Sequence, residues 1–157
     1  MRRLLTAVAA LWLAAAAMAQ SPVSISVSNL PAELARGSSA RVGFELRLLD
    51  EAVVGTQGVW FLNIVEPLGG GDGRQVAHLL FASAREETTV FRRAFSTAEL
   101  AGGLDTAIEF RLRPGAPVGS YLLALQLFDG PNTNPGRVKA ADRMAMEFFP
   151  FRVVAAD

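Results

Sequence analysis

Apolar and polar residues alternate with a period of two along most of the chain, a pattern typical of half-buried β-strands. The clearest example runs from Arg41 to Leu48, where every second residue is apolar. This pattern, or a short run of β-branched and aromatic residues, predicts eight strands, most of them bounded by Gly, Pro, Asn or Asp. The predicted strands are residues 23–28, 41–48, 59–66, 76–82, 88–95, 108–113, 120–129 and 143–154.

One helical signal interrupts this series of strands. Ser96-Thr97-Ala98-Glu99 has the spacing of a capping box, and Gly102-Gly103 would end the helix within two turns. We therefore expect a short connector helix at residues 96–103, and a flexible hairpin loop at Gly69 to Gly73. Because no long helix is available to connect parallel strands, the predicted fold class is all-β, an antiparallel sandwich of about eight strands.

Two spacings around the predicted core resemble the immunoglobulin-like superfamily, and the resemblance covers most of residues 22–155. Trp60 lies fourteen residues after Leu46, as the core tryptophan of strand C follows the first cysteine position of strand B. Tyr121 lies two residues before Leu123, as in a tyrosine corner, where the hydroxyl bonds back to the backbone. The resemblance implies a cysteine-less, bacterial immunoglobulin-like sandwich with strands A, B, C, C′, D, E, F and G in chain order. A jelly roll or another sandwich of similar strand count is the alternative.

The N-terminus has the features of an export signal. Arg2 and Arg3 precede an apolar stretch of fourteen residues, and Ala17-Met18-Ala19 fits the small-x-small cleavage pattern. Fourteen residues are fewer than the roughly 20 that a membrane-spanning helix needs, so a membrane anchor is the weaker interpretation. We predict a signal peptide at residues 1–19 and a single β-sandwich domain at residues 20–157, exported to the periplasm or the extracellular space. No later apolar run is long enough to span a membrane.

The composition removes several kinds of chemistry. The chain has no cysteine, which excludes disulfides, thiolate nucleophiles and cysteine-based zinc sites. Its single histidine excludes a metal site built from several histidines of one chain. The formal net charge of zero gives no nucleic-acid signature. His78 stands in no recognised catalytic motif, so we expect it at the surface or core edge. Because the composition and motifs offer no catalytic or ligand set, we predict no enzymatic activity and no cofactor.

Two kinds of chemistry stay open at this point. Oxygen atoms that calcium could use occur close together at Asp129, Asn132 and Asn134, although their spacing fits no known calcium loop and all three residue types favour turns. Two carboxylates that meet only in space could also hydrolyse a glycoside, but nothing in the sequence singles out such a pair.

The two predicted sheets differ in their outer faces. Strands A, B, E and D would present serine, arginine and glutamate to solvent, whereas strands C′, C, F and G would present mainly apolar residues. The partner-binding residues predicted on the apolar face are Val59, Phe61, Leu122 and Phe128. Soluble monomers rarely expose such a patch, so we expect it to contact a protein partner or a second copy of the chain. The alternative is that a loop or the helix at residues 96–103 covers this face, which would move the search to residues 130–142.

The last predicted strand, residues 143–154, contains an irregularity. Pro150 has no amide donor and cannot lie in a fully paired ladder. Around it, the apolar alternation changes parity, from Met144, Met146 and Phe148 to Phe149, Phe151 and Val153. We predict a one-residue bulge near residues 148–150 that turns both sets toward the core, on a strand that lies at a sheet edge at least locally.

These features favour a non-catalytic interaction or structural module of a bacterial cell envelope, which binds a protein partner through an apolar sheet face or through its loops. One alternative is a carbohydrate- or ligand-binding sandwich, which would need exposed aromatic side chains. Another is a periplasmic assembly chaperone that presents its last strand to a client. A hydrolase is the least favoured.

Overall fold

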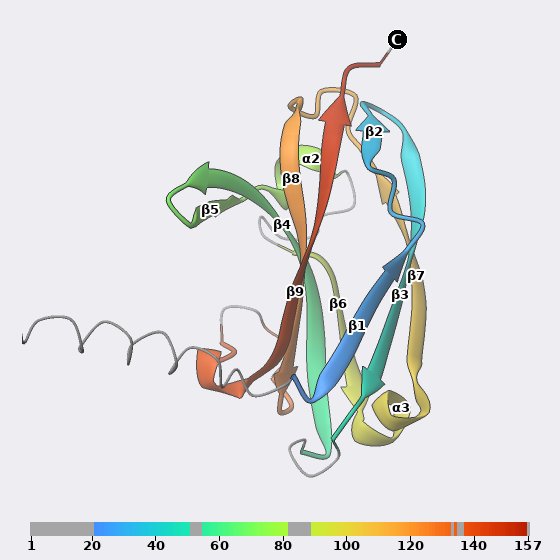
Figure 1. Ribbon diagram of the computed structural model, residues 1–157, viewed down its shortest axis with the longest axis vertical. Helices are drawn as coiled ribbons and strands as arrows, with labels where there is room; N and C mark the ends of the chain where they lie inside the picture. The colour runs from blue at the N-terminus through green and yellow to red at the C-terminus, as the bar shows by residue number, and fades with distance from the viewer. Residues whose placement is uncertain (1–20, 51–54, 82–88, 133, 135–136, 157) are drawn as a thin grey trace, which may run out of the picture.

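The protein consists of two β-sheets packed face to face, which Figure 1 shows as two layers. The computed structural model describes residues 21–50, 55–81, 89–132, 134 and 137–156. The smaller sheet has three antiparallel strands in the order β1-β3-β7. These strands are β1 (Val23–Ser28), β3 (Ser39–Leu48) and β7 (Leu104–Arg111).

The larger sheet has six strands, with the path β2-β9-β8-β4-β5 and with β6 also paired to β4. Its strands are β2 (Glu33–Ala35), β4 (Gln57–Gly69), β5 (Asp72–Gln75), β6 (Thr89–Ser96), β8 (Gly119–Asp129) and β9 (Arg143–Val154). All pairs are antiparallel except β2 with β9. Within the described ranges, the short helical segments are α2 (Ala77–Leu80), α3 (Thr97–Gly102) and the 3-10 turn η2 (Ala140–Asp142).

The strand order confirms the predicted all-β, antiparallel immunoglobulin-like sandwich. The small sheet contains the strands that correspond to A, B and E, and the large sheet contains those that correspond to C, F and G. One assignment is wrong, because the strand expected as D in the small sheet is β6, which pairs with β4 in the large sheet. The apolar residues of β6 occur as the adjacent pairs Val90-Phe91 and Ala94-Phe95, and adjacent residues of a strand face opposite sides, so the pattern alone does not decide between the sheets.

The core lies between the two sheets and is built around Trp60. This side chain is fully buried, with its ring 5.8 Å from the ring of Phe44 and 4.7 Å from that of Phe91. Leu46 and Leu123, which occupy the two cysteine positions of the resemblance, are also fully buried. The core places Trp60 where the sequence predicted it, between the two sheets.

The tyrosine corner is confirmed. The hydroxyl of Tyr121 donates a hydrogen bond to the carbonyl oxygen of Pro117 at 3.0 Å. Burial of the side chain raises the pKa of the Tyr121 phenol above its ordinary value. The bond fixes the chain where it enters β8 after leaving β7 of the other sheet.

Of the two local predictions on the segment after β4, one is wrong and one is confirmed with different bounds. Residues 76–82 were expected to form a strand, but Ala77–Leu80 is the helix α2, and only Phe81 makes an isolated bridge, with Leu112. A short apolar run fits a buried helical turn as well as a strand, so its periodicity could not separate the two. The hairpin expected at Gly69 to Gly73 is present, but its turn is shorter than predicted, because Gly69 ends β4 and Asp72 begins β5, which pairs back onto β4. This β4–β5 hairpin projects from the sandwich in Figure 1.

Candidate functional site

Three of the four predicted partner-binding residues form a second, small apolar cluster on the outer face of the large sheet. Val59, Phe61 and Phe128 are 0%, 1% and 4% exposed, and the two phenylalanine rings meet edge to face at 5.8 Å. Val138, in the segment that links β8 to β9, packs against them. The expectation that these three side chains are exposed is therefore wrong, because the linking segment folds back over this end of the face. Their role in partner binding stays a prediction.

The exposed apolar part of the same face lies on β9. Met146 and Phe148 are 37% and 44% exposed, and they are two residues apart on one side of the strand. They pair with Gln126 and Ala124 of β8, and the next outward position, Pro150, pairs with the half-buried Leu122. We call Leu122, Met146, Phe148 and Pro150 the β9 patch. It retains one residue of the predicted stripe, Leu122.

The β9 patch differs from the other exposed apolar side chains because its members adjoin one another. The large apolar side chains that are exposed elsewhere in the described part are Leu49, Leu68, Leu79 and Val118. They lie on separate elements or turns, where single exposed apolar residues are common and need no explanation. The β9 patch is therefore the strongest candidate for a contact surface.

The predicted bulge at residues 148–150 is absent. The pairing of β9 with β8 is regular from Ala145 to Val153, and the register shifts only beyond it, between Leu127 and Phe128. Met146 and Phe148 consequently face outward instead of joining the core. The predicted edge position is confirmed, because β2 pairs only with residues 152–154.

The direction of the backbone groups explains how the strand accommodates Pro150. The amide of Arg152 donates to the carbonyl oxygen of Ala32, and the carbonyl of Val154 accepts from the amide of Arg36, so both groups point away from β8. Backbone groups alternate in direction along an antiparallel strand, so those of residues 146, 148 and 150 point the same way. The missing N–H of Pro150 would have pointed away from β8, so its absence removes no hydrogen bond from the ladder between β9 and β8.

These groups give β9 a free edge, which we define as residues 145–151. One end is marked by the hydroxyl of Ser21, 3.4 Å from the carbonyl oxygen of Met144, and the other by the bond from Arg152 to Ala32. Glu147 lies between Met146 and Phe148 on the opposite side of the strand, paired with Leu125, and its side chain is exposed. In the part of the chain that the structure describes, no strand pairs with this edge.

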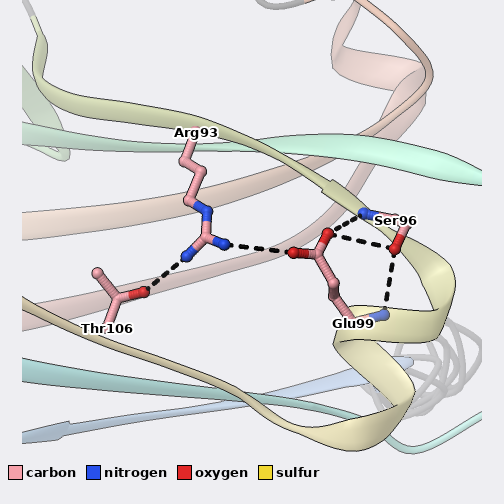
Figure 2. Close-up of polar contacts among 4 residues, drawn as sticks. All are labelled: Arg93, Ser96, Glu99 and Thr106. Carbon is pink, nitrogen blue, oxygen red and sulfur yellow. Dashed lines mark hydrogen bonds and ion pairs between the residues drawn. The ribbon is translucent and has the colours of Figure 1, made fainter.

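A polar cluster links the two sheets at the other side of the sandwich (Figure 2). Ser96 and Glu99 form the predicted capping box at the start of α3, with the Glu99 carboxylate 2.8 Å from the Ser96 amide. Arg93 on β6 contacts Glu99 at 3.3 Å and donates to the hydroxyl of Thr106 on β7 at 3.2 Å. The bonds from Ser96, chiefly from its amide, lower the pKa of Glu99. The cluster contains no activated nucleophile, and its contacts are those of a structural clasp.

A shallow hollow of about 340 Å³ lies on the outer face of the small sheet, around Gly43. A Cβ at Gly43 would overlap the Ser28 hydroxyl, so the close approach of Ser28 on β1 requires glycine at this position. Glu45 and Asp105 stand opposite each other on β3 and β7 at its rim, and Arg47 pairs with Glu45. The hollow is open to solvent, and its lining combines polar side chains with Gly43, Phe44 and Ala107.

The remaining candidate residues are engaged in local structure or lie at the surface. Asp129 accepts a hydrogen bond from the Gly55 amide at 3.2 Å, and the side-chain oxygen of Asn132 accepts one from the Asn134 amide, also at 3.2 Å. These bonds brace turns, and the three residues, for which the sequence predicted no metal site, stay weak calcium candidates. His78 is exposed on α2. Within the described ranges, no group of three or more His, Asp or Glu side chains could hold a metal ion.

Comparisons with known proteins identify no family. No protein-family profile matches the chain, and no curated protein matches it. Solved structures are similar at low identity. The alkylpurine DNA glycosylase AlkC of Pseudomonas fluorescens, bound to DNA, is 11% identical with a TM-score of 0.48, over 85% of this chain and 30% of that one. The chain thus spans about a third of the glycosylase.

Two smaller proteins are similar over most of both chains. The CARDB domain of the PF1109 protein from Pyrococcus furiosus is 12% identical with a TM-score of 0.46, over 84% of this chain and 87% of that one. The soluble domain of PmoD from a Methylocystis species is 15% identical with a TM-score of 0.38, over 84% and 90%. At these TM-scores the likenesses support no functional conclusion, and the β-sandwich fold rests on the topology described above.

Proposed function

We propose that this chain is an exported, non-catalytic interaction module of a bacterial cell envelope that binds a protein partner through the β9 patch. The observation that carries the proposal is the exposure of Met146 and Phe148 as neighbours on one face of an edge strand. Fully burying an exposed methionine or phenylalanine side chain contributes roughly 1.5–3 kcal/mol, and covering the remaining exposed surface of these two partly exposed side chains contributes roughly half of that for each. Exposed apolar neighbours of this kind are costly to keep in water unless a partner covers them.

The export part of the proposal rests on residues 1–19, which have the charge, apolar stretch and cleavage pattern of a signal peptide. Within the described residues, no helix has the length and hydrophobicity needed to cross a bilayer. Mass spectrometry of the natural protein should find an N-terminus at or within a residue or two of Gln20. A chain that retains Met1 in the cytoplasm would overturn this part.

The binding part is tested by affinity capture from the envelope fraction with three baits. Wild type and Leu49→Ser should retain the same partner, because Leu49 is 66% exposed after the end of β3 and is not part of the β9 patch. Phe148→Ser should lose that partner while keeping the wild-type melting temperature. Equal recovery by all three baits contradicts the proposed surface. Recovery that falls with Leu49→Ser instead would place the contact at the turn after β3.

The other function classes differ in what supports them. A carbohydrate platform built on Trp60 has no support, because that side chain is buried between the sheets. An assembly chaperone is the second candidate, because β9 combines a free edge with exposed apolar side chains, as a strand presented to a client would. A hydrolase would require a substrate, which activity profiling of the purified protein on glycosides and esters would reveal.

A further inference from the structure

We infer that the free edge of β9 binds an extended segment of the partner polypeptide as an added β-strand. This inference rests on the proposed function and makes it more specific, because it names the conformation and chemistry of what is bound. It follows from three features that coincide in residues 145–151: backbone groups that pair with no other strand of the described residues, apolar side chains with a period of two, and one charge between them.

The first feature is the direction of the backbone amides and carbonyls at the free edge. The amides and carbonyls of Met146 and Phe148 point away from β8, in the same direction as the Arg152 amide that bonds to β2. A strand laid along this edge would continue the line that β2 begins at residues 152–154. Pro150 offers a carbonyl but no amide, so the complete donor and acceptor pairs are those of residues 146 and 148. Added strands gain affinity from such main-chain bonds and specificity from alternate side chains.

The side chains define what the incoming segment carries. Met146 and Phe148 lie on the outer face, so apolar residues two apart on the segment would pack beside them. Glu147 lies between them on the other face and is exposed, which favours a basic residue directly opposite. The occupant is therefore an extended segment with an apolar-basic-apolar sequence.

The same geometry disfavours a second copy of this chain. Suppose that two copies pair in antiparallel orientation through the amides and carbonyls of residues 146 and 148. Met146 of one copy then lies opposite Phe148 of the other. This pairing also places Glu147 directly opposite Glu147 of the other copy, and like charges in this position destabilise a strand pair. Charged side chains and proline on an edge are common protections against self-association. The edge thus discriminates against copies of itself while remaining open to a segment of complementary charge.

The probe is the acetylated and amidated peptide Thr-Val-Lys-Ile-Thr, titrated to a few millimolar into ¹⁵N-labelled mature protein produced by export. The amide signals of Met146 and Phe148 should shift, and their hydrogen exchange should slow. The amide of Glu147 points toward β8 and should keep its exchange rate. Absence of binding, or binding that leaves the amides of residues 146 and 148 unprotected, overturns the inference.

Two matched peptides separate strand addition from side-chain contact alone. N-methylation of the Val and Ile amides removes the two donors directed at β9 and should weaken binding by about tenfold or more. N-methylation of the Lys amide, which points away from β9, should leave binding unchanged. If the first peptide binds as well as the parent, no strand is added. Loss of the partner by Phe148→Ser would then still support the proposed function.

A charge exchange tests the role of Glu147. Wild type should prefer the Lys peptide over the same peptide with Glu at the centre by about threefold, and Glu147→Lys should reverse that preference. An unchanged preference overturns the basic-residue assignment. Light scattering on the unliganded wild type supplies the remaining test: a stable dimer that Phe148→Ser dissociates would make a second copy the occupant and would overturn the inference.

Discussion

The outer faces of the two sheets differ in composition and in how they are shielded from water. On the small sheet, serines of β1 and charged residues of β3 and β7 face water, as the sequence predicted. Cross-strand neighbours such as Arg41 and Glu109 have opposite charges, which stabilises the pair. On the large sheet the outer face is largely apolar, and it is divided into a covered end and an open end.

The covered and open ends of the large sheet differ in what the neighbouring chain does. At one end, the segment between β8 and β9 brings Val138 onto Phe61 and Phe128. Met146, which lies on β9 in the same cross-strand row as Phe61, marks the boundary, and both it and Phe148 beyond it remain exposed. An apolar pattern on a strand therefore shows that a face needs cover, but only the path of the linking segments shows whether the same chain supplies it.

The largest expected effect compares two consecutive residues of β4. Trp60 faces the core between the sheets and Phe61 faces the outer cluster, and both are fully buried. Trp60→Ala and Phe61→Ala should each lower the free energy of unfolding by about 3–5 kcal/mol. Urea denaturation measures both, with Ser26→Ala on the solvated face as a control that changes stability by less than about 0.5 kcal/mol. A negligible loss for Phe61→Ala would mean that the outer cluster is a surface contact.

The contact of Val138 with the outer cluster can be disrupted by a single substitution. Val138→Asp places a carboxylate against Phe61 and Phe128 and should cost about 1–3 kcal/mol, since a charge beside an apolar cluster loses hydration. Because the cluster would be partly uncovered, binding of a hydrophobic dye should increase. Val118→Asp is the matched control, since Val118 is exposed and contacts neither cluster. Equal effects of the two substitutions would contradict the covering role of Val138.

Much of the architecture could be predicted from the sequence, because the small sheet shows clear alternation and the large sheet has long apolar strands. Seven of the eight predicted strands exist, at β1, β3, β4, β6, β7, β8 and β9. The capping box at Ser96 and the corner at Tyr121 were also predictable, since both depend on residues close in sequence. What failed depends on distant contacts: the sheet to which β6 belongs and the cover over Phe61.

The orientation of β9 shows why part of the candidate site was missed. Continuing the alternation of Phe149, Phe151 and Val153 backward turns Glu147 toward the inner face, which is unfavourable in a closed sandwich. The bulge was predicted for a different reason, so that Met146 and Phe148 could face the core together with Phe149 and Phe151. At a free edge the inner face opens to solvent, so Glu147 is exposed and no bulge is needed. A charged residue at an inward position of an otherwise apolar last strand was the signal for the edge, and for the outward exposure of Met146 and Phe148.

A smaller effect is expected where the chain crosses from one sheet to the other. Tyr121→Phe removes the hydroxyl that bonds to the Pro117 carbonyl while keeping the ring, and it should cost about 0.5–1.5 kcal/mol. Chemical denaturation measures the loss, and Tyr121→Leu should cost more because it also removes contact with the ring of Phe151. If Tyr121→Phe is neutral, the corner does not help to hold β7 and β8 in their separate sheets.

The smallest expected effect concerns the clasp of Arg93, Ser96, Glu99 and Thr106, which joins the two sheets whose outer faces differ. The bonds that the Glu99 carboxylate accepts from Ser96 lower its pKa below the ordinary value of 4.5, and the charge of Arg93 adds to this shift. A carboxyl group with a lowered pKa contributes stability above its unfolded pKa, and this contribution is lost as the pH falls through its folded pKa. Wild type should therefore exceed Glu99→Gln in the free energy of unfolding at neutral pH, and the difference should shrink as the pH falls below 4.5. Urea denaturation over this range measures the difference.

The control variant Arg93→Gln should retain most of the pH dependence, because the bond from the Ser96 amide is the largest cause of the lowered Glu99 pKa. A difference that stays constant with pH would show that the Glu99 charge does not strengthen the clasp.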